Sequence, residues 1–117
     1  MHIILVTLEQ TLPDNNLPVC SSQTLVYTCN TTTGVIRWQE GDKSITYSTD
    51  ITLTLNVSEP LRLFTVQLVS INGNDLSSTA TSQNTSSSDE GTTIVCQDGI
   101  TTLARNVTVA GIFIFYI

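Results

Sequence analysis

The chain has 117 residues, 40% of them hydrophobic, which fits one domain with one hydrophobic core. It carries 10 acidic and 4 basic side chains, and its formal net charge is -6 at pH 7. The basic residues are dispersed along the sequence, which argues against nucleic acids and anionic membrane surfaces as partners, because both are bound through clustered Lys and Arg.

Apolar and polar residues alternate in short blocks, which are separated by Asn, Asp, Gly, Pro and Ser, and helical periodicity is absent. Ser and Thr make up about a quarter of the chain, and this pattern predicts an all-β protein. In chain order, we expect strands at residues 3–8, 24–29, 35–39, 43–47, 51–55, 64–71, 76–81, 92–97 and 103–109.

Two of these blocks have the pattern of core strands. Leu25, Tyr27 and Cys29 stand at every second position and share one face, as do Ile36 and Trp38 in the next block. By the same alternation, residues 51–55 are predicted to form a strand that is wet on one side.

Turn residues separate the later strands. Asn72-Gly73 predicts a hairpin because both residues tolerate a positive φ, and Asp98-Gly99 joins the last two strands. Residues 84–91 are predicted to form a polar corner, whereas residues 12–18, with two prolines, predict an irregular edge.

The spacing of Cys29, Trp38 and Cys96 carries a resemblance to a known family. With Cys, Trp and Cys in this order, the sequence over residues 19–109 resembles the immunoglobulin superfamily. The resemblance implies a Greek-key antiparallel β-sandwich of about 7–9 strands, with a Cys29–Cys96 disulfide between the sheets and Trp38 packed against it. The alternative is that both cysteines are buried thiols.

The sequence departs from the family pattern near the second cysteine. Ile94 lies two residues before Cys96, where the family often has a tyrosine, and Gly91 lies one place earlier than the usual small residue. Glu90 occupies the usual acidic position, and our hypothesis is that it pairs with Arg62. The alternative is two separate solvated charges.

Four N-glycosylation sequons are present, at Asn30, Asn56, Asn84 and Asn106. We expect at least two of them to carry glycans, and we expect Asn30 and Asn84 to lie in loops. Alternation places Asn106 outward, on the sheet face that the family commonly uses for binding. A glycan there would cover part of that face, so we expect binding through the loops or the opposite sheet.

The remaining cysteine, Cys20, makes the cysteine count odd. One interpretation is a disulfide with another chain, including a second copy in a homophilic contact, or with a missing domain. The alternatives are an unpaired thiol near the sandwich edge and a non-standard pairing inside the domain.

The domain is predicted to span residues 19–110, with an edge segment at 1–18 and an apolar tail at 111–117. The apolar run at residues 3–6 is shorter than the core of a secretory signal, and residues 110–117 are too few to cross a bilayer. Two interpretations of the tail are open, a truncated sequence and the start of a membrane anchor.

Catalytic chemistry is not expected, because the only histidine is His2 and no triad can be assembled around it. Neither a metal nor a cofactor is expected, since Cys-x-x-Cys pairs and glycine-rich phosphate loops are missing. The resemblance implies an extracellular recognition or adhesion module of a cell-surface receptor with a protein partner. The alternatives are a structural spacer in a multidomain protein and a secreted binding domain.

Overall fold

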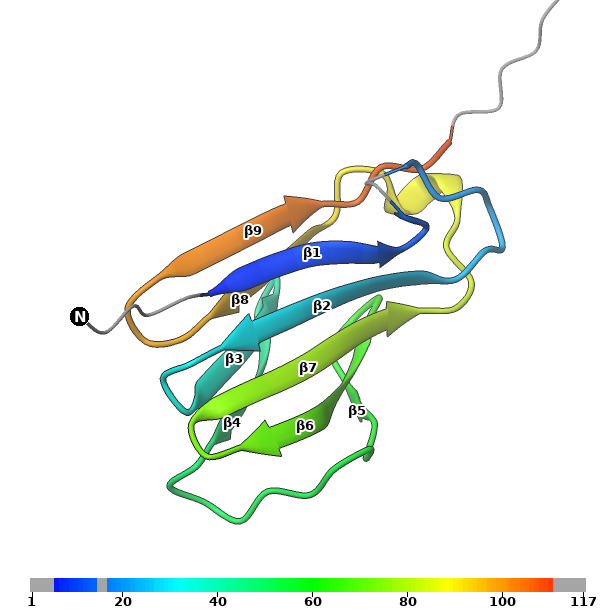
Figure 1. Cartoon of the computed structure of the whole chain (residues 1–117). Coiled ribbons are helices and arrows are strands. Elements are labelled where there is room, and N and C mark those ends of the chain that lie inside the picture. Colours follow the sequence, from blue (N-terminus) through cyan, green and yellow to red (C-terminus); the bar gives the residue numbers. More distant parts are fainter. Residues whose placement is uncertain (1–5, 15–16, 111–117) are drawn as a thin grey trace, which may run out of the picture.

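The computed structural model describes residues 6–14 and 17–110, which form two antiparallel β-sheets packed face to face (Figure 1). One sheet has the order β1-β2-β7-β6-β5, and the other has the order β4-β3-β8-β9. The strands are β1 (Thr7–Leu12), β2 (Leu25–Thr31), β3 (Val35–Glu40), β4 (Lys43–Ser48), β5 (Glu59–Pro60), β6 (Thr65–Asn72), β7 (Asp75–Ser82), β8 (Thr93–Gln97) and β9 (Thr102–Asn106). This confirms the predicted all-β sandwich.

The core lies between the two sheets and follows the predicted alternation. Leu25, Tyr27 and Cys29 of β2 are buried and face Ile36 and Trp38 of β3 across the sandwich. These inward residues alternate with half-buried and exposed ones, because successive side chains of a strand point to opposite faces.

The predicted strand at residues 51–55 is wrong. Ile51 and Leu55 are exposed, and the chain between β4 and β5 runs as a loop. A turn directs the chain away from the edge of β4, with the Ile51 N–H donating to the Ser48 carbonyl at 3.1 Å. In this connection only Glu59 and Pro60 form a strand ladder with β6, so the threonine-rich residues 51–55 lack a strand partner.

Other boundaries move because of register. β1 continues to Leu12 instead of ending at residue 8, since it pairs with β2 along that length, and residues 3–5 lie outside the described part. β9 ends at Asn106, after which Val109 forms an isolated parallel bridge with Val19. The predicted hairpin between β6 and β7 is confirmed, but its turn is Gly73-Asn74, one residue later than expected.

Candidate functional site

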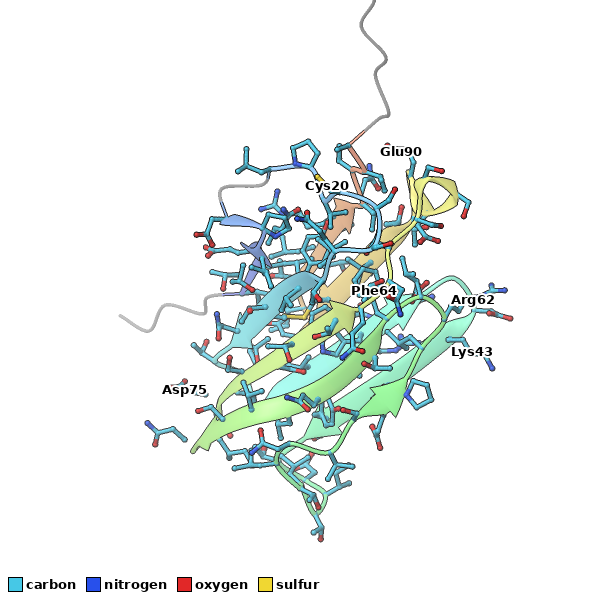
Figure 2. The ribbon with its side chains drawn as sticks, turned by 90° about the vertical axis from the view of Figure 1, so that its right-hand side faces the viewer. Cys20, Lys43, Arg62, Phe64, Asp75 and Glu90 are labelled. Atoms are coloured by element: carbon cyan, nitrogen blue, oxygen red, sulfur yellow. A yellow bond between two sulfur atoms is a disulfide. The ribbon has the colours of Figure 1, made fainter. Side chains whose placement is uncertain are left out.

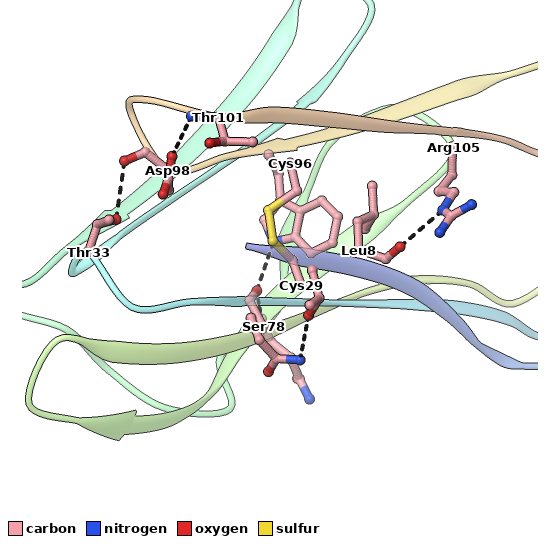
Figure 3. Close-up of a disulfide and its surroundings, with 12 residues drawn as sticks. Leu8, Cys29, Thr33, Ser78, Cys96, Asp98, Thr101 and Arg105 are labelled. Atoms are coloured by element: carbon pink, nitrogen blue, oxygen red, sulfur yellow. Dashed lines mark hydrogen bonds between the residues drawn. A yellow bond between two sulfur atoms is a disulfide. The ribbon is translucent and has the colours of Figure 1, made fainter. Parts of the chain in front are cut away.

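The predicted disulfide between Cys29 and Cys96 is confirmed, and it joins β2 of one sheet to β8 of the other. Trp38 is fully buried and is the register partner of Cys96 in the neighbouring strand. Its indole Nε1 donates to Ser78 Oγ at 2.8 Å (Figure 3). The Ser78 hydroxyl donates in turn to the Gln67 carbonyl at 2.6 Å. The buried serine therefore ties the tryptophan to the opposite sheet.

The sequons are exposed at all four asparagines, but one predicted placement is wrong. Asn30 lies within β2 and not in a loop, because β2 extends to Thr31 in register with β7. The expected loop position of Asn84 is confirmed, between β7 and the 3-10 turn η2 (Ser87–Asp89).

Asn106 is the last residue of β9 and lies on the outer face of the four-stranded sheet, opposite Thr93. Its Oδ1 accepts a hydrogen bond from Thr93 Oγ1 at 2.8 Å. Val107 and Val109 are buried, as predicted. Asn106 therefore lies at the end of this face that is farthest from the turn between β8 and β9.

The hypothesis of a Glu90–Arg62 ion pair is wrong. Arg62 Nη1 lies 3.3 Å from Asp42 Oδ1, and both side chains are exposed. Glu90 instead accepts the backbone N–H of Val109 at 2.8 Å. Figure 2 shows Glu90 and Arg62 well apart, because Glu90 is bonded to the segment that follows β9 at one end of the sandwich.

Cys20 is an exposed free thiol. Pairing inside the domain is wrong, since the only other two cysteines of the chain are joined to each other. A tight turn holds Cys20, with its N–H donating to Gln23 Oε1 at 2.9 Å and its carbonyl accepting the Gln23 N–H at 3.0 Å.

Four connections meet at one end of the sandwich, which we call the loop end: residues 32–34, 49–52, 73–74 and 98–101 (Figure 1). Gly34 joins three of them. Its N–H donates to the Asn74 carbonyl at 2.8 Å, and its own carbonyl accepts the Thr49 N–H at 2.9 Å. Thr33 Oγ1 donates to the Asp98 carbonyl at 3.2 Å and connects the fourth.

Gly34 is required at this junction for two reasons. Its φ is +80°, a conformation that other residues rarely adopt, and a Cβ would lie only 2.7 Å from Thr49 Oγ1 and 2.8 Å from Asn74 Oδ1. The absence of a side chain therefore lets the loops approach each other closely.

Asp98 shapes the tip of the β8–β9 hairpin. Its carboxylate is buried, and Oδ1 accepts the N–H groups of Ile100 at 2.9 Å and Thr101 at 2.7 Å (Figure 3 shows the bond to Thr101). Among the large hydrophobic side chains that the structure describes, Ile100 is the most exposed, at 75%. Ile100 is thus exposed to solvent at the tip of the hairpin, where hydrogen bonds to the Asp98 carboxylate fix the backbone.

Sequence reasoning missed the roles of Ser78 and Asp98, although alternation offered a signal. Asp98 follows Ile94 and Cys96 at inward positions of the same strand phase, and Ser78 occupies an inward position of β7. A polar side chain at an inward position needs a hydrogen-bond partner. That requirement identifies such residues but not their partners.

A hollow of about 230 Å³ lies beside the long β4–β5 loop. It is lined by Thr46 and Tyr47 of β4, by Glu59 of β5, and by the loop residues Ile51, Thr52, Leu53, Thr54 and Val57. The buried Tyr47 hydroxyl forms no well-aligned hydrogen bond with any described residue, although the Glu59 carboxylate is near enough to act on it. Burial, reinforced by that negative charge, raises the pKa of Tyr47 to about 12.

This raised pKa predicts a loss of stability in alkali. Because the folded state keeps the Tyr47 proton and the unfolded state releases it near pH 10, the free energy of unfolding is retained below pH 10 and falls between pH 10 and about 12. Absorbance at 295 nm should show Tyr47 titrating last. Denaturation of Tyr47→Phe should show a smaller alkaline loss, and Glu59→Gln should lower the pKa of Tyr47. An unchanged titration in Glu59→Gln would contradict the assignment.

The predicted tail at residues 111–117 and His2 lie outside the described residues. Within residues 6–14 and 17–110, no helix is long and apolar enough to span a bilayer, and His, Cys, Asp and Glu side chains nowhere gather in a group of three or more that could hold a metal ion. No protein-family model matches the sequence, and no curated protein shows significant similarity to it.

Proposed function

We propose that this chain is an immunoglobulin-like, non-catalytic recognition module of a cell-surface receptor, which contacts a protein partner through its loop end. The Cys29–Cys96 disulfide supports an extracellular location, because structural disulfides persist in oxidising compartments and are rare in the cytosol. The order Cys29, Trp38, Cys96 and the two-sheet sandwich support the family assignment.

The observation that carries the contact surface is the exposed Ile100 on a fixed hairpin. Hydrogen bonds from Ile100, Thr101 and Thr33 converge on Asp98, so the isoleucine is presented without a flexible backbone. A binding loop that is ordered before association loses less conformational entropy on binding. Ile51 of the β4–β5 loop is also exposed at this end and adds a second apolar contact.

Two of the four sequons lie far from this surface, whereas Asn30 stands in β2 two residues before the loop end. Asn84 follows β7 and Asn106 ends β9, which places both at the end opposite the loop end (Figure 1). Glycans at these two asparagines would leave the loop end uncovered.

A glycan added to the hairpin tip tests the proposal. Ile100→Asn creates a sequon, because Thr102 stands two positions later, and it replaces the exposed isoleucine while the backbone bonds to Asp98 remain. The wild-type domain, displayed as a multimer, is screened against surface ectodomains from the same organism. We expect Ile100→Asn to abolish binding to the partner found, and Asn84→Gln and Asn106→Gln to bind as wild type does.

Binding that survives the added glycan would refute the loop end as the contact surface. Failure of the wild-type multimer to bind any ectodomain would favour the alternative of a structural spacer. Secretion of the expressed domain with the Cys29–Cys96 disulfide intact is expected under either outcome.

A further inference from the structure

We propose that Asn56 carries an N-linked glycan whose first sugars cover an exposed apolar edge of the domain. The proposal rests on the extracellular location proposed above. It assigns this sequon a structural role that the other three do not share, since the apolar side chains to be covered are its own neighbours in the sequence.

The two residues that flank Asn56 are large, apolar and exposed. Leu55 is 43% exposed and Val57 is 49% exposed, although both belong to a loop that packs along the edge of the sandwich. A group that covers these two side chains would remove apolar surface from water, which contributes about 25 cal/mol per Å². Asn56 lies between them, so a group attached to its side chain would begin inside this apolar edge.

The backbone at Asn56 is fixed in a way that directs its side chain outward. The Asn56 N–H donates to the Leu68 carbonyl of β6 at 2.8 Å, and its φ is +62°. Asparagine adopts this left-handed conformation more readily than most residues, so the turn is compatible with the sequon. The side chain itself is exposed and is therefore open to modification in the folded protein.

The surroundings suit an N-acetylglucosamine core. A pyranose ring has C–H faces that pack on aliphatic side chains, and its hydroxyl and acetamido groups form hydrogen bonds. The hollow beside Val57 offers the Thr52 and Thr54 side chains and the Glu59 carboxylate as partners for those groups. Because Val57 lines this hollow as well, apolar and polar contacts are both available there.

The modification is an ordinary group transfer. The Asn56 side-chain nitrogen forms a bond to C1 of the first sugar, the bond from C1 to the diphosphate of a lipid-linked oligosaccharide breaks, and the amide loses one proton. Ser58 completes the recognised sequence and lies at the edge of β6, where its Oγ is 3.4 Å from Gln67 Oε1.

The test compares the secreted domain with two substitutions at Ser58. Ser58→Ala removes the sequon without changing Asn56, whereas Ser58→Thr keeps it. Site occupancy is measured by mass spectrometry of the Asn56 peptide, and exposure of apolar surface is measured with a fluorescent dye that binds such surface. We expect several-fold higher dye fluorescence for Ser58→Ala than for Ser58→Thr, and no rise for Asn84→Gln, which removes a glycan elsewhere.

Trimming the glycan identifies which part of it acts. An endoglycosidase that leaves one N-acetylglucosamine on Asn56 should keep dye fluorescence low, and Ser58→Ala should lose its high fluorescence when Leu55→Ser and Val57→Ser are added. Occupied Asn56 with equal fluorescence in Ser58→Ala and Ser58→Thr would overturn the proposal. If Asn56 carries no glycan while Asn84 does, only the proposal for Asn56 is overturned. If the domain is not secreted, the proposed function is overturned as well.

Discussion

Removal of the Cys29–Cys96 disulfide is expected to lower the free energy of unfolding by about 4 kcal/mol. The two cysteines are separated by 67 positions in the sequence, and a cross-link across so long a loop restricts the unfolded chain strongly. Small domains have net stabilities of about 5–15 kcal/mol, so this bond supplies a large share of the total. Part of the reduced population is therefore expected to be unfolded at 37 °C.

The double variant Cys29→Ala, Cys96→Ala measures this loss without leaving a reactive half-cystine. Urea denaturation followed by the fluorescence of Trp38, the single tryptophan, gives the midpoint for each protein. Cys20→Ser is the matched control, since Cys20 is exposed and free, and its midpoint should equal that of the wild type. A double variant as stable as the control would show that the sandwich does not depend on the cross-link.

The central strands of both sheets could be predicted from the sequence because their physics is local. In β2, β3 and β8, every second residue is buried and most of these residues are apolar, and burial on one face fixes both the strand and its register. The pairing of Cys29 with Cys96 came instead from the resemblance, since spacing alone does not determine which thiols meet.

Edge elements could not be predicted in the same way. Apolar and polar residues alternate as regularly in residues 51–55 as in β8, yet residues 51–55 form a loop. A strand also needs a neighbouring strand to bond to, and the turn after Ser48 directs these residues away from one. Propensity does not report whether a partner strand is within reach. The same limit applies to the Glu90–Arg62 hypothesis, because the distance between these two side chains depends on the tertiary structure and not on the local sequence.

Glu40 shows how a polar residue at an inward position was overlooked. It follows Ile36 and Trp38 in the inward phase of β3 and is only 4% exposed. Its Oε1 accepts the N–H groups of Arg62 and Phe64, each at 3.1 Å, and its Oε2 accepts that of Leu63 at 2.8 Å. One carboxylate thus satisfies three consecutive backbone donors at the corner that leads into β6.

This arrangement ties the two sheets together, because Glu40 ends a strand of the four-stranded sheet and the corner begins a strand of the five-stranded one. Phe64 is fully buried at that corner and packs edge-on against Tyr27, with ring centroids 5.8 Å apart. Displacing the corner would therefore disturb the core as well as the three hydrogen bonds.

Glu40→Ala is expected to destabilise the domain by about 3–5 kcal/mol, since hydrogen bonds to charged groups contribute about 1.5–3 kcal/mol each and are not fully additive. Glu40→Gln should cost less, because its amide oxygen can keep the bonds to Arg62 and Phe64 while its NH₂ group faces the Leu63 N–H. Asp42→Asn is the control, since the Asp42–Arg62 pair is exposed and its loss should change stability by less than about 1 kcal/mol. We predict that the urea midpoint is highest for Asp42→Asn, lower for Glu40→Gln and lowest for Glu40→Ala. Equal midpoints for Asp42→Asn and Glu40→Ala would contradict this prediction and would mean that water replaces the carboxylate at the corner.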